Sequence, residues 1–173
     1  MNGRRDVEAP GPRLLLISSE WPTLRTPVQQ ASVRRQAEAL QGAGMSVEIF
    51  AFHGRGFYNY AAAWTRLRPR LHVERYDLVH AQDASDVLLA LPKRVPLVVT
   101  VGKQDLKRLV RQLLAVFLAS RADAVIVGSD EMRGWVRTRA PVHVIPPNLD
   151  GPALAARLVD VYRSILPERF SAS

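Results

Sequence analysis

The alternation of short apolar runs with longer segments of helical periodicity constrains the fold of this chain more than any other feature. The apolar runs, each four to six residues long, cover residues 13–18, 47–52, 76–81, 96–101, 124–128 and 142–145. The segments of helical periodicity include residues 29–43, 85–91, 106–121 and 130–139. Strands that alternate with helices build a parallel sheet with helices on both faces. We therefore expect an α/β fold in one domain, with any binding site at the carboxyl edge of the sheet.

The length and the composition agree with one domain and exclude several classes of protein. A chain of 173 residues with 47% hydrophobic residues has room for a single α/β core. It contains no cysteine, which excludes disulfides, thiolate nucleophiles and cysteine metal sites. No apolar run approaches the roughly 20 residues that cross a bilayer. We expect a cytoplasmic protein with a flexible leader, residues 1–12, and a tail, residues 167–173.

The net charge is +8, and most of the basic residues are arginine. This balance favours anionic partners such as phosphate groups or acidic lipids, although an arginine-rich surface without a partner gives the same composition. No nucleic-acid-binding motif is recognised, so we expect no nucleic acid partner. The dinucleotide glycine fingerprint, the Walker loop and zinc-ligand spacing are also missing. The sequence therefore predicts no cofactor and no metal site.

Five parts of the chain carry, in order, the pattern of a known family. They are the opening segments 18–22, 33–40 and 44–49, and then residues 76–81, 96–100, 121–129 and 144–150. Together they resemble the N-terminal domain of GT-B retaining glycosyltransferases of the glycogen-synthase-like group. The resemblance implies a Rossmann-like domain on the acceptor side of an enzyme. The parental reaction moves a sugar from a nucleotide-sugar donor to an acceptor, with retention of configuration.

Two departures from the family pattern argue against ordinary transferase chemistry. Gln30 stands where the family has a glycine beside the donor diphosphate, and Ser32 stands where it tends to have phenylalanine. Gly102 occupies the position of a histidine that lies near the reacting sugar. We therefore predict no catalytic residue. A former interdomain cleft is assigned to these three residues together with Ser129, Asn148 and Asp150.

A third departure is the missing nucleotide-sugar domain, which in the family follows the position of Asp150. Here Gly151 leads directly into a helical segment with one apolar face. The segment resembles the last helix of a complete enzyme, which packs back on the first domain. We predict an N-terminal domain over residues 13–150 and a returning helix over residues 151–166. The chain is then an acceptor-side half, natural or engineered and inactive alone, whose partner is the missing domain or a second copy bound through the exposed cleft. The alternative is a stand-alone module for an anionic small molecule, a lipid head group or a partner domain.

Polar residues in the loops at the predicted carboxyl edge are candidates for binding an acceptor. They are Glu20, Trp21, Thr23, His80, Gln82, Asp83, Lys103 and Asp105. Amides and carboxylates hydrogen-bond to sugar hydroxyls, whereas a lysine suits an anionic acceptor. Each assignment has an alternative. Helix capping or turn formation is the alternative for Gln82, Asp83, Asp105 and the cleft residue Ser129, and packing is the alternative for His80. The remaining residues could simply belong to loops, namely a capping loop for Glu20, Trp21 and Thr23 and an ordinary loop for Asn148 and Asp150.

Residues 54–71 combine arginines with Phe57, Tyr60 and Trp64 around a helix that we expect to end at Pro69. Basic amphipathic helices with aromatic faces bind anionic membrane surfaces. We expect the three aromatic side chains to pack against the sheet. Peripheral contact of residues 54–71 with an anionic membrane is the alternative.

Overall fold

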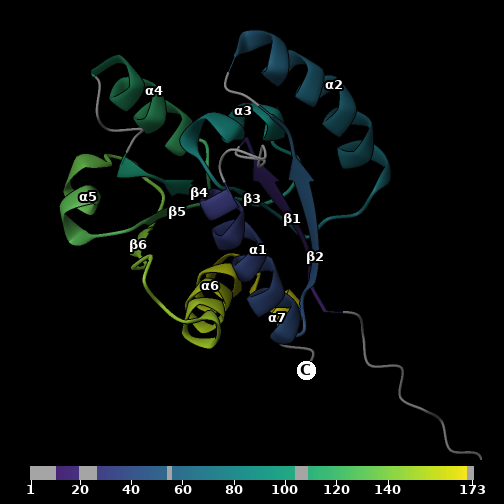
Figure 1. Cartoon of the computed structure of the whole chain (residues 1–173), viewed down its shortest axis with the longest axis vertical. Helices are drawn as coiled ribbons and strands as arrows, with labels where there is room; N and C mark the ends of the chain where they lie inside the picture. The colour runs from purple at the N-terminus through teal and green to yellow at the C-terminus, as the bar shows by residue number, and fades with distance from the viewer. Residues whose placement is uncertain (1–10, 20–26, 54–55, 104–108, 171–173) are drawn as a thin grey trace, which may run out of the picture.

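The computed structural model of the chain describes residues 11–19, 27–53, 56–103 and 109–170 (Figure 1). Its centre is a six-stranded sheet in which every neighbouring pair of strands is parallel. The strands are β1 (Arg13–Ser18), β2 (Ser46–Ala51), β3 (Leu78–Ala81), β4 (Leu97–Val101), β5 (Ala124–Val127) and β6 (Val142–Val144). Their order in the sheet is β2-β1-β3-β4-β5-β6, so the strand order reverses between β1 and β3. The predicted α/β fold with a parallel sheet is confirmed.

Helices cover both faces of this sheet (Figure 1). One face carries α1 (Pro27–Gly42), α6 (Gly151–Ile165) and α7 (Pro167–Phe170). The other carries α2 (Phe57–Val73), the short 3₁₀ helix η1 (Ala84–Asp86), α3 (Val87–Ala90), α4 (Leu109–Ala119) and α5 (Asp130–Trp135). The most extensive contact between helices joins α1 to α6. The last long helix therefore packs beside the first one.

The central strands are apolar on both faces because helices cover both. In β1, Leu14 and Leu16 face α1 and α6, whereas Leu15 and Ile17 face the other helical layer. This alternation follows the two-residue period of a strand, and burial on both sides explains the unbroken apolar runs in the sequence. Within the described part of the chain, no helix is long and apolar enough to cross a membrane.

The turn after α1 shows how a glycine fixes the route from that helix into β2. Gly44 has a φ of 84°, in the left-handed region that side chains disfavour. Its N–H donates to the carbonyl of Gln41, and the N–H of Met45 donates to the carbonyl of Leu40. These two bonds form a Schellman motif, and the buried Met45 side chain supplies its apolar contact.

Helix α2 departs from the sequence prediction in two ways. It continues past Pro69 to Val73, because Pro69 and Thr65 are exposed and water can bond to the carbonyl that the proline leaves without a donor. Tyr60 packs edge-on against Phe52 with ring centroids 5.0 Å apart. Phe57, by contrast, is 82% exposed, so the expectation that it packs against the sheet is wrong.

Candidate functional site

A cavity of about 430 Å³ lies at the carboxyl edge of the sheet, next to α1 and α6. Its volume falls in the range of small-molecule sites. The side chains that line it from the helices are Arg35 and Gln36 of α1, Leu154 and Leu158 of α6, and Met132 of α5. The residues that line it from the strand ends and loops are Gln82, Thr100, Val101, Gly102, Lys103, Ile126, Val127, Gly128, Ser129, Ile145, Pro146 and Pro147.

The charges in this cavity are of one sign. Arg35 and Lys103 line it, and no carboxylate does so among the described residues. Gln82 also lines it, and its Nε2 is buried without a hydrogen-bond partner in the described structure. A buried amide N–H without a partner can donate to an oxygen of a bound molecule. The cavity is therefore suited to an anionic ligand that also carries hydrogen-bond acceptors.

Four of the residues that the sequence singled out come together here. Gln82, Gly102, Lys103 and Ser129 all line the cavity, although they follow three different strands. Ser129 has a second role, because its hydroxyl accepts the N–H of Met132 at 3.3 Å and caps α5. The lining residues from α1 and α6 were not predicted.

Other predicted residues lie outside the cavity. The Asp83 carboxylate accepts the N–H of Ser85 at 2.9 Å and caps η1. The Asp150 carboxylate caps α6 by accepting the N–H of Ala153 at 2.8 Å. Asn148 is exposed in the loop before α6.

Six of the predicted residues fall wholly or partly outside the described structure. Glu20, Trp21, Thr23 and Asp105 are outside the described residues. Gln30 and Ser32 belong to α1, but their side chains are not described.

His80 lies inside the domain rather than in the cavity, and it is completely buried. Its Nδ1 is 2.7 Å from the Tyr162 hydroxyl of α6 and 3.4 Å from Nε2 of Gln36. Its Nε2 is 2.9 Å from the Thr100 hydroxyl of β4. Burial lowers the pKa of His80 to about 3, so the ring is neutral at physiological pH.

The hydrogen-bond partners of His80 determine which of its ring nitrogens carries the proton. The Gln36 amide nitrogen is a donor, so Nδ1 accepts and Nε2–H donates to Thr100. We call His80, Gln36, Thr100 and Tyr162 the His80 cluster. It joins β3 to α1, β4 and α6, which makes His80 a packing residue that holds the last long helix on the sheet.

A second buried cluster lies on the other face, and the sequence did not reveal it. Asp86 is fully buried and accepts the N–H of Ser19 at 3.1 Å. Its Oδ1 is 3.0 Å from the Tyr60 hydroxyl, which is 2.8 Å from the Ser85 hydroxyl. Ser85 in turn donates to Asp83 at 2.7 Å. We call these five residues the Asp86 cluster. The only signal for it in the sequence was an aspartate within the helical segment 85–91.

Burial and the nearby charge of Asp83 raise the pKa of Asp86 to about 7. When Asp86 is protonated, one consistent chain of donors runs along the cluster. The Asp86 O–H donates to Tyr60, Tyr60 donates to Ser85, and Ser85 donates to ionised Asp83. The cluster lies where the strand order reverses, and it holds the start of the loop after β1 against the turn after β3. No group of side chains suited to hold a metal ion occurs in the described ranges.

The comparisons with known proteins agree with this architecture. Residues 29–150, well over half of the chain, match the sequence model of Glycosyltransferase Family 4. The chain belongs to this family. The predicted resemblance to the N-terminal domain of GT-B enzymes is thereby confirmed. No curated protein matches the sequence.

Two similar solved structures are of sucrose-phosphate synthase from Thermosynechococcus elongatus. One is named with the residue ranges 27–220 and 406–426; it is 17% identical with a TM-score of 0.70, and the match covers 89% of this chain and 99% of that chain. The other is 16% identical with a TM-score of 0.61, and the match covers 78% of this chain and 48% of that chain. The family 4 chain thus spans about half of the second structure. At this identity the likeness shows the fold alone.

Proposed function

We propose that this family 4 chain is the acceptor-side half of a glycosyltransferase and that its cavity binds an acceptor with an anionic group. The observation that carries the proposal is the cavity itself. It lies at the carboxyl edge of the sheet, where ligands of open α/β folds bind. Arg35 and Lys103 line it without a carboxylate from the described residues, which suits a phosphate or carboxylate on the acceptor.

The route of the chain after β6 supports the absence of a nucleotide-sugar domain between β6 and α6. Only a short loop separates β6 from α6, and Asp150 in that loop caps α6 directly. Leu158, Val161 and Tyr162 of α6 are buried against the sheet and α1. A solved structure named with two separate ranges of sucrose-phosphate synthase matches 89% of this chain, which supports the same arrangement here. We infer that sugar transfer requires a nucleotide-sugar domain from outside residues 1–173.

In the full reaction this half supplies binding and orientation. Arg35 and Lys103 hold the anionic group of the acceptor, and the Gln82 amide donates to an acceptor oxygen. Closure of a second domain over the cavity would exclude water and bring the donor to the acceptor hydroxyl.

Acceptor binding is tested by an NMR titration with glucose 6-phosphate and with neutral glucose. We expect saturable shifts of the amides of Gly102, Lys103 and Ser129 with glucose 6-phosphate and weaker shifts with glucose. Lys103→Gln should weaken the binding about tenfold, because one charge-assisted bond is lost. The matched control Arg66→Gln removes a charge from α2, on the other face, and should change the affinity less than twofold. No saturable shift at the cavity, or equal losses in both variants, would refute the proposal.

The missing donor site is tested by calorimetry with UDP-glucose. We expect no saturable binding to this chain alone, and tight binding would show that the chain holds a donor site. A second measurement mixes the chain with a separately produced nucleotide-sugar domain and follows UDP release. Acceptor binding without any transfer in such mixtures would favour the alternative, a stand-alone binding module.

Helix α2 supports a second proposal, peripheral contact with an anionic membrane. Phe57 and Tyr58 are 82% and 86% exposed at the start of this helix, and Arg66 and Arg70 are exposed farther along it. Apolar burial and lipid charge then act together. We expect the chain to sediment with phosphatidylserine vesicles but not with phosphatidylcholine vesicles, and the double variant Phe57→Ser and Tyr58→Ser to lose this binding. Sedimentation that does not respond to lipid charge and salt would contradict it.

A further inference from the structure

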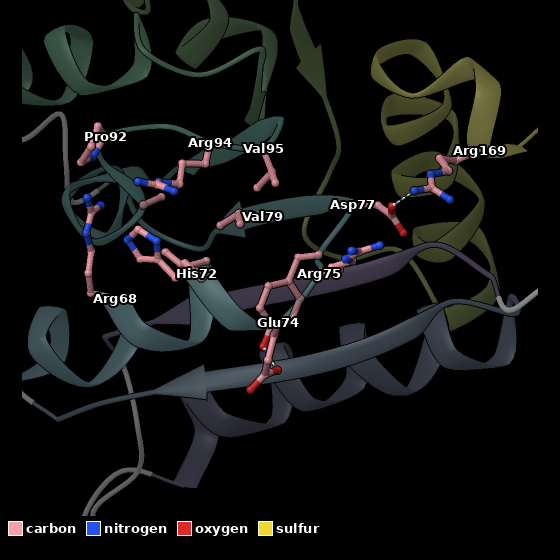
Figure 2. Close-up of a pocket in the computed structure, with 13 residues that line it drawn as sticks. Arg68, His72, Glu74, Arg75, Asp77, Val79, Pro92, Arg94, Val95 and Arg169 are labelled. Atoms are coloured by element: carbon pink, nitrogen blue, oxygen red, sulfur yellow. Dashed lines mark hydrogen bonds and ion pairs between the residues drawn. The ribbon is translucent and has the colours of Figure 1, made fainter.

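A second cavity, of about 340 Å³, lies at the amino edge of the sheet, opposite the edge that carries the first (Figure 2). It is formed by the end of α2, the loops that precede β3 and β4, and α7. The proposed acceptor function does not use any of these segments. The proposed acceptor function therefore does not account for this cavity.

Positive charge predominates in this cavity. Arg68, Arg75, Arg94 and Arg169 line it together with His72, whereas the only acidic residues among its lining are Glu74 and Asp77. Figure 2 shows Arg68, His72 and Arg94 gathered at one end, with the pair of Asp77 and Arg169 at the other.

Both acidic side chains already have partners. Asp77 pairs with Arg169 at 2.8 Å, and its second oxygen accepts the N–H of Arg13 at 2.9 Å. Glu74 accepts the Tyr76 hydroxyl and lies 3.8 Å from the Arg13 guanidinium. The pKa of Glu74 is lowered, first by the Tyr76 hydrogen bond, so its carboxyl is ionised and engaged.

Arg94 and Arg75 form no ion pair with another described residue, which leaves their charges uncompensated within that part of the chain. Arg68 is held in place, since it donates to the carbonyl of Leu91 at 3.4 Å and lies 5.2 Å over the Trp64 ring. The guanidinium groups of Arg68, which is held in place, and of Arg94, which has no ion-pair partner among the described residues, can both donate hydrogen bonds to a tetrahedral anion.

The remainder of the cavity is apolar. Val79 and Ala90 are buried in its wall, and Leu71 and Val95 are half-buried beside them. An inorganic anion would leave this surface in contact with water, whereas an organic group attached to the anion would cover it.

We propose that this amino-edge cavity binds a phosphate monoester, with the phosphate between Arg68, His72 and Arg94 and an apolar or aromatic group against Leu71, Val79 and Val95. The site is separate from the acceptor cavity, because the two lie at opposite edges of the sheet.

An NMR titration with phenyl phosphate, inorganic phosphate and phenol tests both halves of the site. We expect the amides of His72, Arg94 and Val95 to shift in a saturable way, and phenyl phosphate to bind at least tenfold tighter than either of the other probes. Arg94→Gln should weaken phenyl phosphate binding about tenfold. Arg157→Gln, which removes an exposed arginine from α6, should weaken it less than twofold.

Two further measurements examine the role of the Arg94 guanidinium and the source of the phosphate group. Arg94 is exposed, so its variants should fold, and Arg94→Lys should bind with intermediate affinity because it keeps the charge and loses the planar fork. Vesicle sedimentation is measured in the Phe57→Ser and Tyr58→Ser background, which lacks the proposed membrane contact of α2. Sedimentation with phosphatidic acid vesicles that Arg94→Gln abolishes would assign the phosphate to a lipid, and binding of phenyl phosphate without sedimentation would assign it to a soluble molecule. Shifts only at Gly102 and Ser129 would place phenyl phosphate in the acceptor cavity and overturn the proposal. Equal losses in Arg94→Gln and Arg157→Gln would also overturn it.

Discussion

The two buried polar clusters of this domain lie on opposite faces of the sheet and respond to pH in opposite directions. His80 and Asp86 are both completely buried, and burial favours the neutral form of each. For His80 the folded pKa is lowered to about 3, so its contribution to stability is lost as the pH falls below its ordinary value of about 6.5. For Asp86 the folded pKa is raised to about 7, so its contribution is present at acidic pH and is lost as the pH rises through 7.

The two clusters respond differently to pH because different side chains complete their hydrogen-bond networks. The His80 cluster is closed by the neutral side chains of Gln36, Thr100 and Tyr162. The Asp86 cluster ends on a second carboxyl, Asp83, whose charge helps to raise the pKa of Asp86. Equal burial therefore gives α6 a support that is present near neutrality and lost at acidic pH, whereas the support for the turn after β3 is present at acidic pH and lost as the pH rises. The following predictions test this contrast from the largest expected effect to the smallest.

Removal of the Tyr162 ring should cause the largest loss. Tyr162 is fully buried in α6 and bonds to His80, so Tyr162→Ala should lower the free energy of unfolding by about 3–5 kcal/mol. Urea denaturation at pH 7 measures this change. Tyr58→Ala is the matched control, because Tyr58 is 86% exposed and its loss should change stability by about 0.5 kcal/mol or less. Similar effects in both variants would show that α6 does not depend on the His80 cluster.

Asp86→Asn should stabilise the protein at pH 8 by up to about 4 kcal/mol, and much less at pH 4. The reason is that the substituted amide carries no charge to bury, and it can donate to Tyr60 as the protonated carboxyl does. Urea denaturation over pH 4–8 gives the comparison. An equal loss of stability at both ends of that range would contradict the raised pKa.

The response of His80 is isolated by comparing two variants that both lack the Asp86 carboxyl. In the Asp86→Asn protein, His80 should lower the free energy of unfolding by about 3 kcal/mol from pH 6.5 to pH 4, because the unfolded chain binds a proton at this residue and the folded chain does not. The double variant Asp86→Asn and His80→Gln lacks the imidazole of His80 but keeps the other titratable groups. The difference between its stability curve and that of Asp86→Asn therefore measures the effect of His80. Parallel curves for the single and double variants would refute the assignment.

Loss of one hydroxyl from each cluster should give the smallest effects. Tyr60→Phe should cost about 1 kcal/mol at pH 5 and about 2 kcal/mol at pH 8, because the lost bond at pH 8 is to an ionised carboxylate. Tyr162→Phe should cost about 1 kcal/mol at both pH values, because its partner His80 is neutral throughout. Thermal or urea unfolding of both variants at pH 5 and pH 8 measures these losses. If the loss of stability in Tyr162→Phe also depended on pH, the two clusters would not differ in the way that we infer.

The sequence predicted the strands well for a physical reason. A parallel strand buried on both faces must be apolar at every position, and runs such as Ala124–Val127 are visible without any knowledge of the partners. Gln82, Gly102, Lys103 and Ser129 were also accessible to prediction, because residues that follow parallel strands gather at one edge.

What the sequence did not reveal depends on contacts between distant segments. Asp86 is bonded to Ser19 and Tyr60, which lie 67 and 26 residues away, so no local pattern indicated its burial. Arg35 and Leu158 enter the cavity at the carboxyl edge from helices whose positions are set by packing. The continuation of α2 through Pro69 depends on an exposed carbonyl, and exposure is a property of the folded chain.

The bond between His80 and Tyr162 also has a consequence for the order of folding. The two residues are 82 positions apart, so this contact closes a very long loop. During synthesis, the apolar face formed by Leu14, Leu16 and Leu78 lacks α6 until the last part of the described chain has been made. A nascent chain can cover this face early with α1 alone, and the face is completed only when α6 has been made.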